Sequence, residues 1–147
     1  MWNQIHEMPF IEKGGEAQVA DELSAYNPLI PKGRELVATV MFEIGDPLRR
    51  GALLAKLGGI EETAFIRIGG ATARETISGV PEIDVDRTSA AGKASAVQFI
   101  HFPFTDAQVA AFCAPEAEIV LGFSHPEYAH MVVFPEPVRG ALAGDFD

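Results

Sequence analysis

The sequence has one cysteine, few basic residues and no long apolar run, and each shortage excludes a class of protein. With Cys113 as the only cysteine no intrachain disulfide can form, which favours a reducing cytoplasm over a secreted location. Because Cys113 follows apolar residues and has no basic neighbour in sequence, we expect a small core residue rather than a nucleophile. No apolar run approaches the roughly 20 residues that cross a bilayer, and Met1 to Glu7 lack the basic and apolar parts of a signal peptide. We expect a soluble, cytoplasmic protein.

The shortage of basic residues decides the surface charge. The chain has 11 lysines and arginines against 21 aspartates and glutamates, a formal net charge of −10 and a pI near 4.7. Such a surface repels nucleic-acid phosphates and anionic lipid headgroups. Arg49 with Arg50, and Arg87 with Lys93, are local basic spots, but no basic stripe interleaved with aromatic residues is present. We therefore expect binding neither to nucleic acid nor to a membrane.

What the sequence does hold is an ordinary hydrophobic content. Of the 147 residues 48% are hydrophobic and 22% charged, which is the balance of a globular domain with a core of its own. Apart from an N-terminal arm, we therefore expect one globular domain.

Residues 1–34 differ in pattern from the rest. Trp2, Ile5 and Met8 fall on one helical stripe before Pro9, and a second short helix fits residues 16–25. Prolines then favour an extended segment up to residue 34. We predict an N-terminal helical arm with an extended linker over residues 1–34 and a core domain over residues 35–147. Because the apolar stripe of the arm needs a cover, we also expect a homodimer.

The core domain begins with a strand, a helix and a second strand. Apolar residues alternate over residues 36–44, Asp46 and Pro47 open a helix that runs to Gly58 and Gly59, and residues 64–68 resume the strand pattern. If the two strands are neighbours they are parallel with a right-handed crossover, and a strand inserted between them is equally allowed. Gly69 and Gly70 predict a hairpin to an edge strand over residues 71–77.

The second half of the core domain follows a long polar stretch from residue 78 to residue 92. Residues 94–104 are apolar on both faces and predict a central strand, and Thr105 and Asp106 cap a short helix. Two more strands are predicted over residues 118–123 and 130–134, and a last helix over residues 137–142. The sum is an α+β fold, with a mixed, largely antiparallel sheet of about six strands and about three covering helices.

The polar stretch ends in a string that resembles the lysine half of a phosphate-binding loop. The motif needs a glycine where Arg87 stands, and it needs a helix after Lys93, where this segment leads into a strand. Nucleotide binding of that type is excluded on these grounds. In a weaker form of the hypothesis, a carboxylate or phosphate ligand is bound on the loop by Arg87, Thr88, Ser89 and Lys93. The alternative is a solvated loop.

A second candidate site lies between residues 125 and 130. Glu127 and His130 have the Glu-x-x-His spacing of di-iron bundles, but those sites need two such pairs and further glutamates on four long helices. A looser group of His125, Glu127 and His130 fits a single metal ion, and His125 with Tyr128 fits a small ligand. The alternative is that His125 is a turn residue before proline and His130 a residue on the strand surface.

Other polar residues give weaker signals. His101 lies among phenylalanines, where a hydrogen-bonded core histidine is expected. Glu61 with Glu62, and Asp84 with Asp86, are expected on solvated loops, although acid–base catalysis by two carboxylates assembled by the fold stays open. The sequence contains no nucleophile elbow, zinc-ligand spacing, dinucleotide fingerprint or paired-cysteine motif. No cofactor is identified.

Segments spread over the whole chain carry a resemblance to a bacterial family known only as a domain of unknown function. They are Gln4, Glu7-Met8, Glu22-Leu23, Tyr26 to Pro31, Gly59 to Glu61, Lys93 to Val97, His125-Pro126 and Tyr128. The resemblance implies a longer N-terminal segment in the family, so this chain looks like a version that lacks it, and Pro9 stands where the family more usually has leucine. It also implies a genomic association with rubrerythrin-like and iron–sulfur heterodisulfide-reductase-like proteins. It implies no activity and no catalytic residue.

Two hypotheses of function follow. The first, favoured by the lack of catalytic motifs and by the implied gene neighbours, is a non-enzymatic accessory or interaction domain that works with a rubrerythrin-like or iron–sulfur oxidoreductase in a redox or peroxide-handling system. The second is a small ligand- or metal-binding protein, or an enzyme, that uses the turn from His125 to His130 together with the loop of Arg87 and Lys93.

Overall fold

The computed structural model describes residues 23, 27–69, 74–82, 88–89 and 92–146. The chain divides into two compact units, Met1–Lys32 and Gly33–Asp147. In the first unit the described residues include a short 3-10 helix, η1 (Asn27–Leu29). The helices predicted over residues 1–25 fall almost entirely outside the described residues. The second unit holds the remaining elements and both candidate sites.

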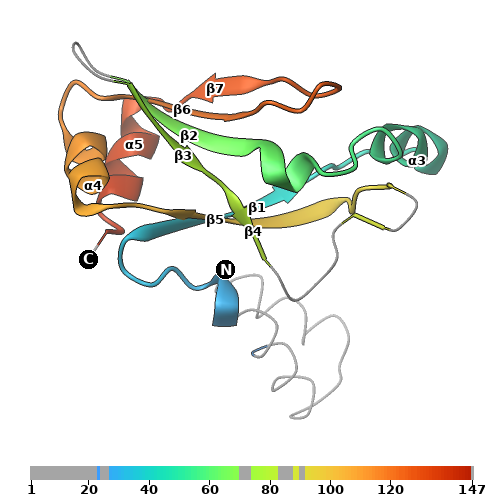
Figure 1. The fold of residues 1–147 in the computed structure, drawn as a ribbon, viewed down its shortest axis with the longest axis horizontal. Helices are drawn as coiled ribbons and strands as arrows, with labels where there is room; N and C mark the ends of the chain where they lie inside the picture. The colour runs from blue at the N-terminus through green and yellow to red at the C-terminus, as the bar shows by residue number, and fades with distance from the viewer. Residues whose placement is uncertain (1–22, 24–26, 70–73, 83–87, 90–91, 147) are drawn as a thin grey trace. The chain divides into compact units, whose positions relative to one another are not determined.

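The second unit contains two antiparallel sheets (Figure 1). One has the order β1-β5-β4 and the other the order β3-β2-β6-β7. Their strands are β1 (Glu35–Met41), β2 (Ala64–Gly69), β3 (Arg74–Ser78), β4 (Val80–Pro81), β5 (Val97–Pro103), β6 (Glu118–Phe123) and β7 (Met131–Val133). The α+β class and the antiparallel pairing are confirmed, with the strands divided between two sheets.

β1 and β2 are neither neighbours nor separated by an inserted strand, the two arrangements that the sequence left open, because they lie in different sheets. β1 pairs with β5 along its whole length, from Glu35 opposite Pro103 to Met41 opposite Val97. β2 has β3 on one edge and β6 on the other. With both edges of β2 paired, no edge is left for β1, so the helix between them leads from one sheet to the other.

The long polar stretch contains a strand that the sequence did not indicate. β4 is only two residues long and includes Pro81, yet it pairs with β5, with Val80 opposite His101. Proline is tolerated on an edge strand, where its missing N–H is not needed by a neighbour. β5 is thereby the middle strand of its sheet, as predicted, and on its inner face Gln98, Ile100 and Phe102 are fully buried.

The main core lies between the inner faces of the two sheets. Ala64, Ile66 and Ile68 of β2 are buried together with Ile100 and Phe102 of β5. Alternate residues of each strand point to this core, so the alternating apolar residues of β1 and β2 correctly predicted the buried face. Among the described residues, no helix is long and apolar enough to cross a membrane.

Two helices lie side by side at one end of this core, α4 (Asp106–Cys113) and α5 (Glu136–Ala143) (Figure 1). Thr105 caps α4 as predicted, in a reciprocal capping box with Gln108. Cys113 ends α4 at an exposed position, which corrects the expectation of a core residue. Its thiol lies 4.0 Å from the carbonyl oxygen of Ala143, at the helix surface rather than inside the core.

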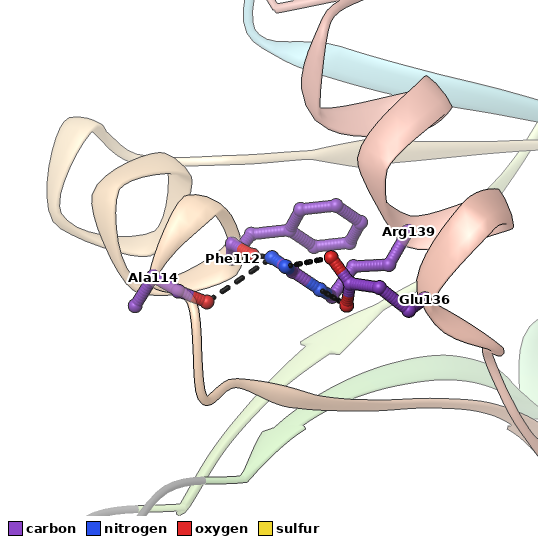
Figure 2. A network of polar contacts seen from close by, with 4 residues as sticks. All are labelled: Phe112, Ala114, Glu136 and Arg139. Atoms are coloured by element: carbon purple, nitrogen blue, oxygen red, sulfur yellow. Dashed lines mark hydrogen bonds and ion pairs between the residues drawn. The ribbon is translucent and has the colours of Figure 1, made fainter.

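A buried arginine joins these two helices (Figure 2). Arg139 of α5 donates to the carbonyl oxygens of Phe112 and Ala114 at 3.1 Å each, at the C-terminal end of α4. Its other guanidinium nitrogens donate to both carboxylate oxygens of Glu136, at 2.8 and 2.7 Å. The guanidinium therefore satisfies helix-end carbonyls that would otherwise lack partners.

The third helix, α3 (Pro47–Leu54), lies at the opposite end of the core (Figure 1). Asp46 caps it as predicted, because its side chain accepts a hydrogen bond from the amide of Arg49 at 2.9 Å. A 3-10 helix, η2 (Ile60–Thr63), follows and leads directly into β2. The segments that carry the candidate residues meet at this end.

Candidate functional site

A double-glycine turn between α3 and η2 is the centre of the candidate site. Gly59 has a φ of 79°, a left-handed conformation that glycine adopts without strain. At Gly58 the requirement is space, because a Cβ there would lie 2.2 Å from the carbonyl oxygen of Gly92. The backbone around Gly92 therefore packs directly against the turn, and only a residue without a side chain fits at position 58.

The segment around Gly92 is the phosphate-loop candidate. Ser89 and Lys93 close a tight turn, in which the amide of Ser89 donates to the carbonyl oxygen of Lys93 at 2.9 Å. The side chain of Thr88 reaches the glycine turn, where its hydroxyl oxygen accepts a hydrogen bond from the amide of Gly59 at 2.9 Å. Lys93 and Ser89 are exposed. Arg87 lies outside the described residues, and the segment leads into β5 rather than into a helix, as predicted.

The segment between β6 and β7 carries the histidine candidates, and it contacts the same double-glycine turn. His125 is buried, and its Nε2 lies 3.2 Å from the carbonyl oxygen of Gly58. Its Nδ1 accepts a hydrogen bond from the amide of Glu127 at 3.2 Å, which makes Nε2 the protonated nitrogen that donates to Gly58. Both ring nitrogens of His125 are thus occupied by contacts within the fold.

Tyr128 lies at the middle of an aromatic group on this turn. Its ring meets those of Phe42 and Phe123 edge-on, with centroids 5.7 and 5.9 Å away. The ring of His130 lies 4.4 Å away, tilted by 58°. Such contacts add packing energy beyond the buried area. Tyr128 therefore anchors the turn on a small second core, made of Leu54, Leu57, Ile60 and Ala94.

The metal candidates His125, Glu127 and His130 lie close in sequence but differ in environment. His125 is buried with both nitrogens in use, while Glu127 and His130 are exposed. Among the described residues no group of three or more histidine, cysteine, aspartate or glutamate side chains is placed to hold a metal ion. Metal binding at this turn stays a prediction, and it would require one ring nitrogen of His125 to give up its hydrogen bond.

Glu61 is the polar residue at this site that sequence reasoning misjudged. It was expected on a solvated loop, but it is buried in η2 while its neighbour Glu62 is exposed. The hydroxyl of Thr88 donates to its Oε1 at 2.7 Å. Because the oxygen of the same hydroxyl accepts from Gly59, the proton of Thr88 is committed to Glu61. No local signal in the sequence distinguishes Glu61 from Glu62, because the two glutamates follow the same Gly58-Gly59-Ile60 segment.

The fold therefore brings together the two candidate segments that the sequence left apart. Thr88 and Gly92 contact the glycine turn from one segment, and His125 contacts it from the other. Figure 1 shows η2, the segment before β5 and the turn before β7 at the same end of the second unit. His101 is elsewhere, on the outer face of β5, with Nδ1 3.4 Å from Oε2 of Glu35.

An exposed apolar edge is the second feature with a functional implication. Met131, Val132 and Val133, which make up β7, are 62, 53 and 54% exposed. β7 is an edge of the four-stranded sheet, paired on one side with β6. On the outer face the side chains of Met131 and Phe65 close over Gly122, where a Cβ would lie 2.7 Å from each. The surface beside the edge thus holds Met131 and Phe65, with the guanidinium of Arg67 over the Phe65 ring, 5.0 Å from its centroid.

Comparisons with known proteins give a family and a structural relative. A family model described as "Protein of unknown function (DUF3501)" matches residues 1–146. A crystal structure from Burkholderia pseudomallei K96243, titled a novel protein of unknown function, is similar with a TM-score of 0.83 and 38% sequence identity. The match covers 98% of this chain and 73% of that chain. None of the curated proteins matches the chain significantly.

Proposed function

The chain belongs to the DUF3501 family of proteins of unknown function, and from that premise we propose that it is a non-enzymatic accessory domain that binds a redox protein. The observation that carries the proposal is the exposed apolar edge strand β7. Edge strands with free N–H and C=O groups pair readily with an extended segment of another chain. Natural domains normally protect such an edge with charges, proline, a bulge or a very short strand, and of these devices β7 has the short length, of three residues.

The hydrogen bonds around β7 show which backbone groups are open. His130 accepts from the amide of Phe123 at 2.9 Å, and the amide of Phe134 donates to Ile119 at 2.8 Å, so these residues face β6. Backbone N–H and C=O groups point alternately to the two sides of a strand. The N–H and C=O of Val132 therefore also point to β6, whereas those of Met131 and Val133 point to the open side. Among the described strands, none pairs with that side of β7.

The edge is unprotected in composition too. β7 contains no charged residue, no proline and no glycine, and all three of its side chains are apolar. An extended partner segment that paired with Met131 and Val133 would bury these side chains and satisfy their backbone groups. The occupant that we propose is therefore an extended, apolar segment of the partner, added antiparallel to β7 as a fifth strand.

The class of partner rests on the family resemblance. That resemblance implies gene neighbours of the rubrerythrin-like and iron–sulfur heterodisulfide-reductase-like classes, and the chain itself has no catalytic motif. An accessory domain needs a docking surface and no reaction centre. The partner proposed is thus an iron-containing oxidoreductase of one of these two classes.

The test uses a charge placed on the edge. Val133→Lys adds an ammonium to the outer face beside the open edge of β7 and leaves the hydrogen bonds to β6 in place. Leu48→Lys adds the same charge to an exposed apolar residue of α3. Tagged wild-type chain and both variants are used to isolate partners from the native host, with identification by mass spectrometry. We expect a rubrerythrin-like or iron–sulfur oxidoreductase with the wild type and with Leu48→Lys, but not with Val133→Lys.

Three other outcomes contradict the proposal. If the wild type isolates no oxidoreductase, the redox part is wrong. If Val133→Lys isolates the same oxidoreductase as the wild type, β7 is not the docking strand. If light scattering shows a wild-type dimer that Val133→Lys converts to a monomer, the occupant of the edge is a second copy of this chain, which is the predicted homodimer.

A second candidate function is favoured by the meeting of the two candidate segments at Gly58 and Gly59. This is binding of a small ligand or metal ion by Thr88, Ser89, Lys93, His125 and Tyr128, with Arg87 added from the predicted loop. The simplest test is metal analysis of purified wild type and His125→Ala. Absence of stoichiometric metal from the wild type would remove the metal form of this candidate, and equal metal content in both proteins would remove His125 from the site.

A further inference from the structure

Two buried side-chain oxygens in the second unit have no hydrogen-bond donor among the described residues, namely Oε2 of Glu61 and Oε1 of Gln98. Glu61 is 8% exposed and Gln98 is 0% exposed. Buried polar atoms are nearly always paired, and a buried carboxylate without a cation or enough donors is strongly disfavoured. A carboxylate oxygen and a carboxamide oxygen can only accept, so what each needs is a donor or a positive charge.

The orientation of each group is fixed by its other atoms. The Nε2 of Gln98 donates to the carbonyl oxygen of Ser95 at 3.0 Å, and a flipped amide would set two oxygens against each other there. The Oε1 of Glu61 is held by the hydroxyl of Thr88, whose oxygen is in turn held by the amide of Gly59. The Gln98 amide cannot flip without losing its hydrogen bond, and a flip of the Glu61 carboxylate, whose two oxygens are equivalent, would again leave one of them without a donor.

Both residues lie at the same end of the space between the sheets. η2, which holds Glu61, packs against β5, which holds Gln98. A Cβ built on Gly79 would touch Ala64 at 3.1 Å and Ile100 at 2.6 Å, so the start of β2 faces the middle of β5. Glu61 precedes Ala64, and Gln98 precedes Ile100 on the same inner face, both toward the end occupied by α3.

Among the described residues, no cation forms an ion pair with the carboxylate of Glu61. Arg34, Arg50 and Arg139 bind elsewhere, at Asp106, at the carbonyl oxygen of Ile44 and at Glu136. A carboxylate and a carboxamide oxygen are ligands of hard cations, which bind through oxygen. A single buried negative charge is neutralised by a single positive one.

We propose that Glu61 and Gln98 bind one small monovalent cation, of the size of Na⁺, K⁺ or NH₄⁺, inside the fold. The cation accepts the lone pairs of Oε2 of Glu61 and Oε1 of Gln98, and backbone carbonyls complete its shell. This site is distinct from the metal candidate at His125 and is independent of the docking function of β7. It makes the folded state dependent on the kind of cation present, and not only on ionic strength.

The test compares salts at equal ionic strength. Thermal unfolding of the whole chain is measured in NaCl, KCl, NH₄Cl and tetramethylammonium chloride, the last cation being too large for a buried site. Screening of surface charge is the same in all four. We expect the wild type to melt at a higher temperature in at least one small-cation salt than in the tetramethylammonium salt, with a saturable dependence on that cation.

Two neighbouring glutamates give a matched pair of variants. Glu61→Gln supplies an amide donor in place of the charge. It should therefore fold, and its melting temperature should no longer differ between the salts. Glu62→Gln removes the same charge from the exposed adjacent position and should keep the difference. Gln98→Met, which removes the second oxygen, should reduce it. The three variants each differ from the wild type by one residue, two at the site and one beside it.

Several results overturn the proposal. Equal melting temperatures of the wild type in all four salts mean that no cation is bound, as would follow if a buried water bridged the two oxygens. A salt difference that persists in Glu61→Gln places the cation elsewhere. A difference lost in Glu62→Gln as well as in Glu61→Gln assigns the effect to surface charge.

Discussion

The imidazole of His125 joins the turn before β7 to the turn after α3, because its Nε2 lies 3.2 Å from the carbonyl oxygen of Gly58. The two residues are far apart in the chain, so this contact holds together segments that have no local reason to meet. Substitution of His125, of Gly58, of Thr88 and of Glu136 gives effects on stability that can be measured.

Truncation of His125 should destabilise the fold. His125→Ala removes the bond to Gly58 and the bond from the amide of Glu127, and it leaves a gap at a buried position. We expect a loss of about 2 kcal/mol in the free energy of unfolding, measured by urea titration. His130→Ala, at an exposed position on the same turn, should cost less than about 1 kcal/mol. Equal costs would mean that the Gly58 contact contributes nothing.

Two glycines should respond in opposite directions to the same substitution. Gly58→Ala places a Cβ 2.2 Å from the carbonyl oxygen of Gly92, so the two segments must move apart. We expect a loss of about 1–3 kcal/mol. Gly51→Ala, within α3 and with nothing near its Cβ, should instead stabilise by about 0.5–1 kcal/mol. Thermal unfolding of both variants beside the wild type checks the signs, and a stabilised Gly58→Ala would contradict the close approach.

The hydroxyl of Thr88 should matter more than that of Ser89. Thr88→Val keeps the shape but leaves the amide of Gly59 and Oε1 of Glu61 without their partner. The expected cost is about 1–3 kcal/mol. Ser89→Ala removes a contact to the amide of Lys93 at an exposed position and should stay within about 0.5 kcal/mol. Denaturant unfolding at one pH measures the loss of unfolding free energy in each variant. Similar losses would argue against the hydrogen bonds that run from Gly59 through Thr88 to Glu61.

Acid should weaken the link between α4 and α5. The pKa of Glu136 is lowered from its usual 4.5, mainly because Arg139 donates a hydrogen bond to the carboxylate. A lowered folded-state pKa stabilises above the unfolded value, and that stability is lost as the pH falls through the folded value. Below pH 4.5 the free energy of unfolding should therefore fall less steeply with acid in Glu136→Gln than in the wild type. Since Glu136 is largely exposed, the difference should be small.

The control for this pH dependence is Glu62→Gln, another exposed glutamate without such a partner among the described ion pairs. Its pH profile should follow that of the wild type. If Glu136→Gln and Glu62→Gln have the same profile, the link from Arg139 to α4 works through its bonds to Phe112 and Ala114 alone.

The local elements of the second unit were predictable, because each depends on neighbours in sequence. Alternating apolar residues give β1 and β2 their buried faces, and the caps at Asp46 and Thr105 accept amides only three residues on. These patterns also give the edge position of β3 and the central position of β5, since exposure follows from polarity.

The contacts of the candidate site required the tertiary structure, because they join residues that are distant in the chain. The sequence placed Glu61 beside Glu62 on a solvated loop, and nothing local distinguishes the two. Only the packing of the segment around Thr88 on the glycine turn buries one of them and leaves the other in water. Cys113 shows the reverse case, in which an apolar neighbourhood in sequence did not lead to burial.

The sequence by itself determined an acidic α+β chain with its strands and helix caps, because composition, periodicity and capping act over a few residues. The tertiary structure alone decided that the strands form two sheets, that β7 keeps an open apolar edge, and that Glu61 and His125 converge on one glycine turn. Burial and pairing of this kind depend on which distant segments pack together, and a single sequence carries no local signal for that choice.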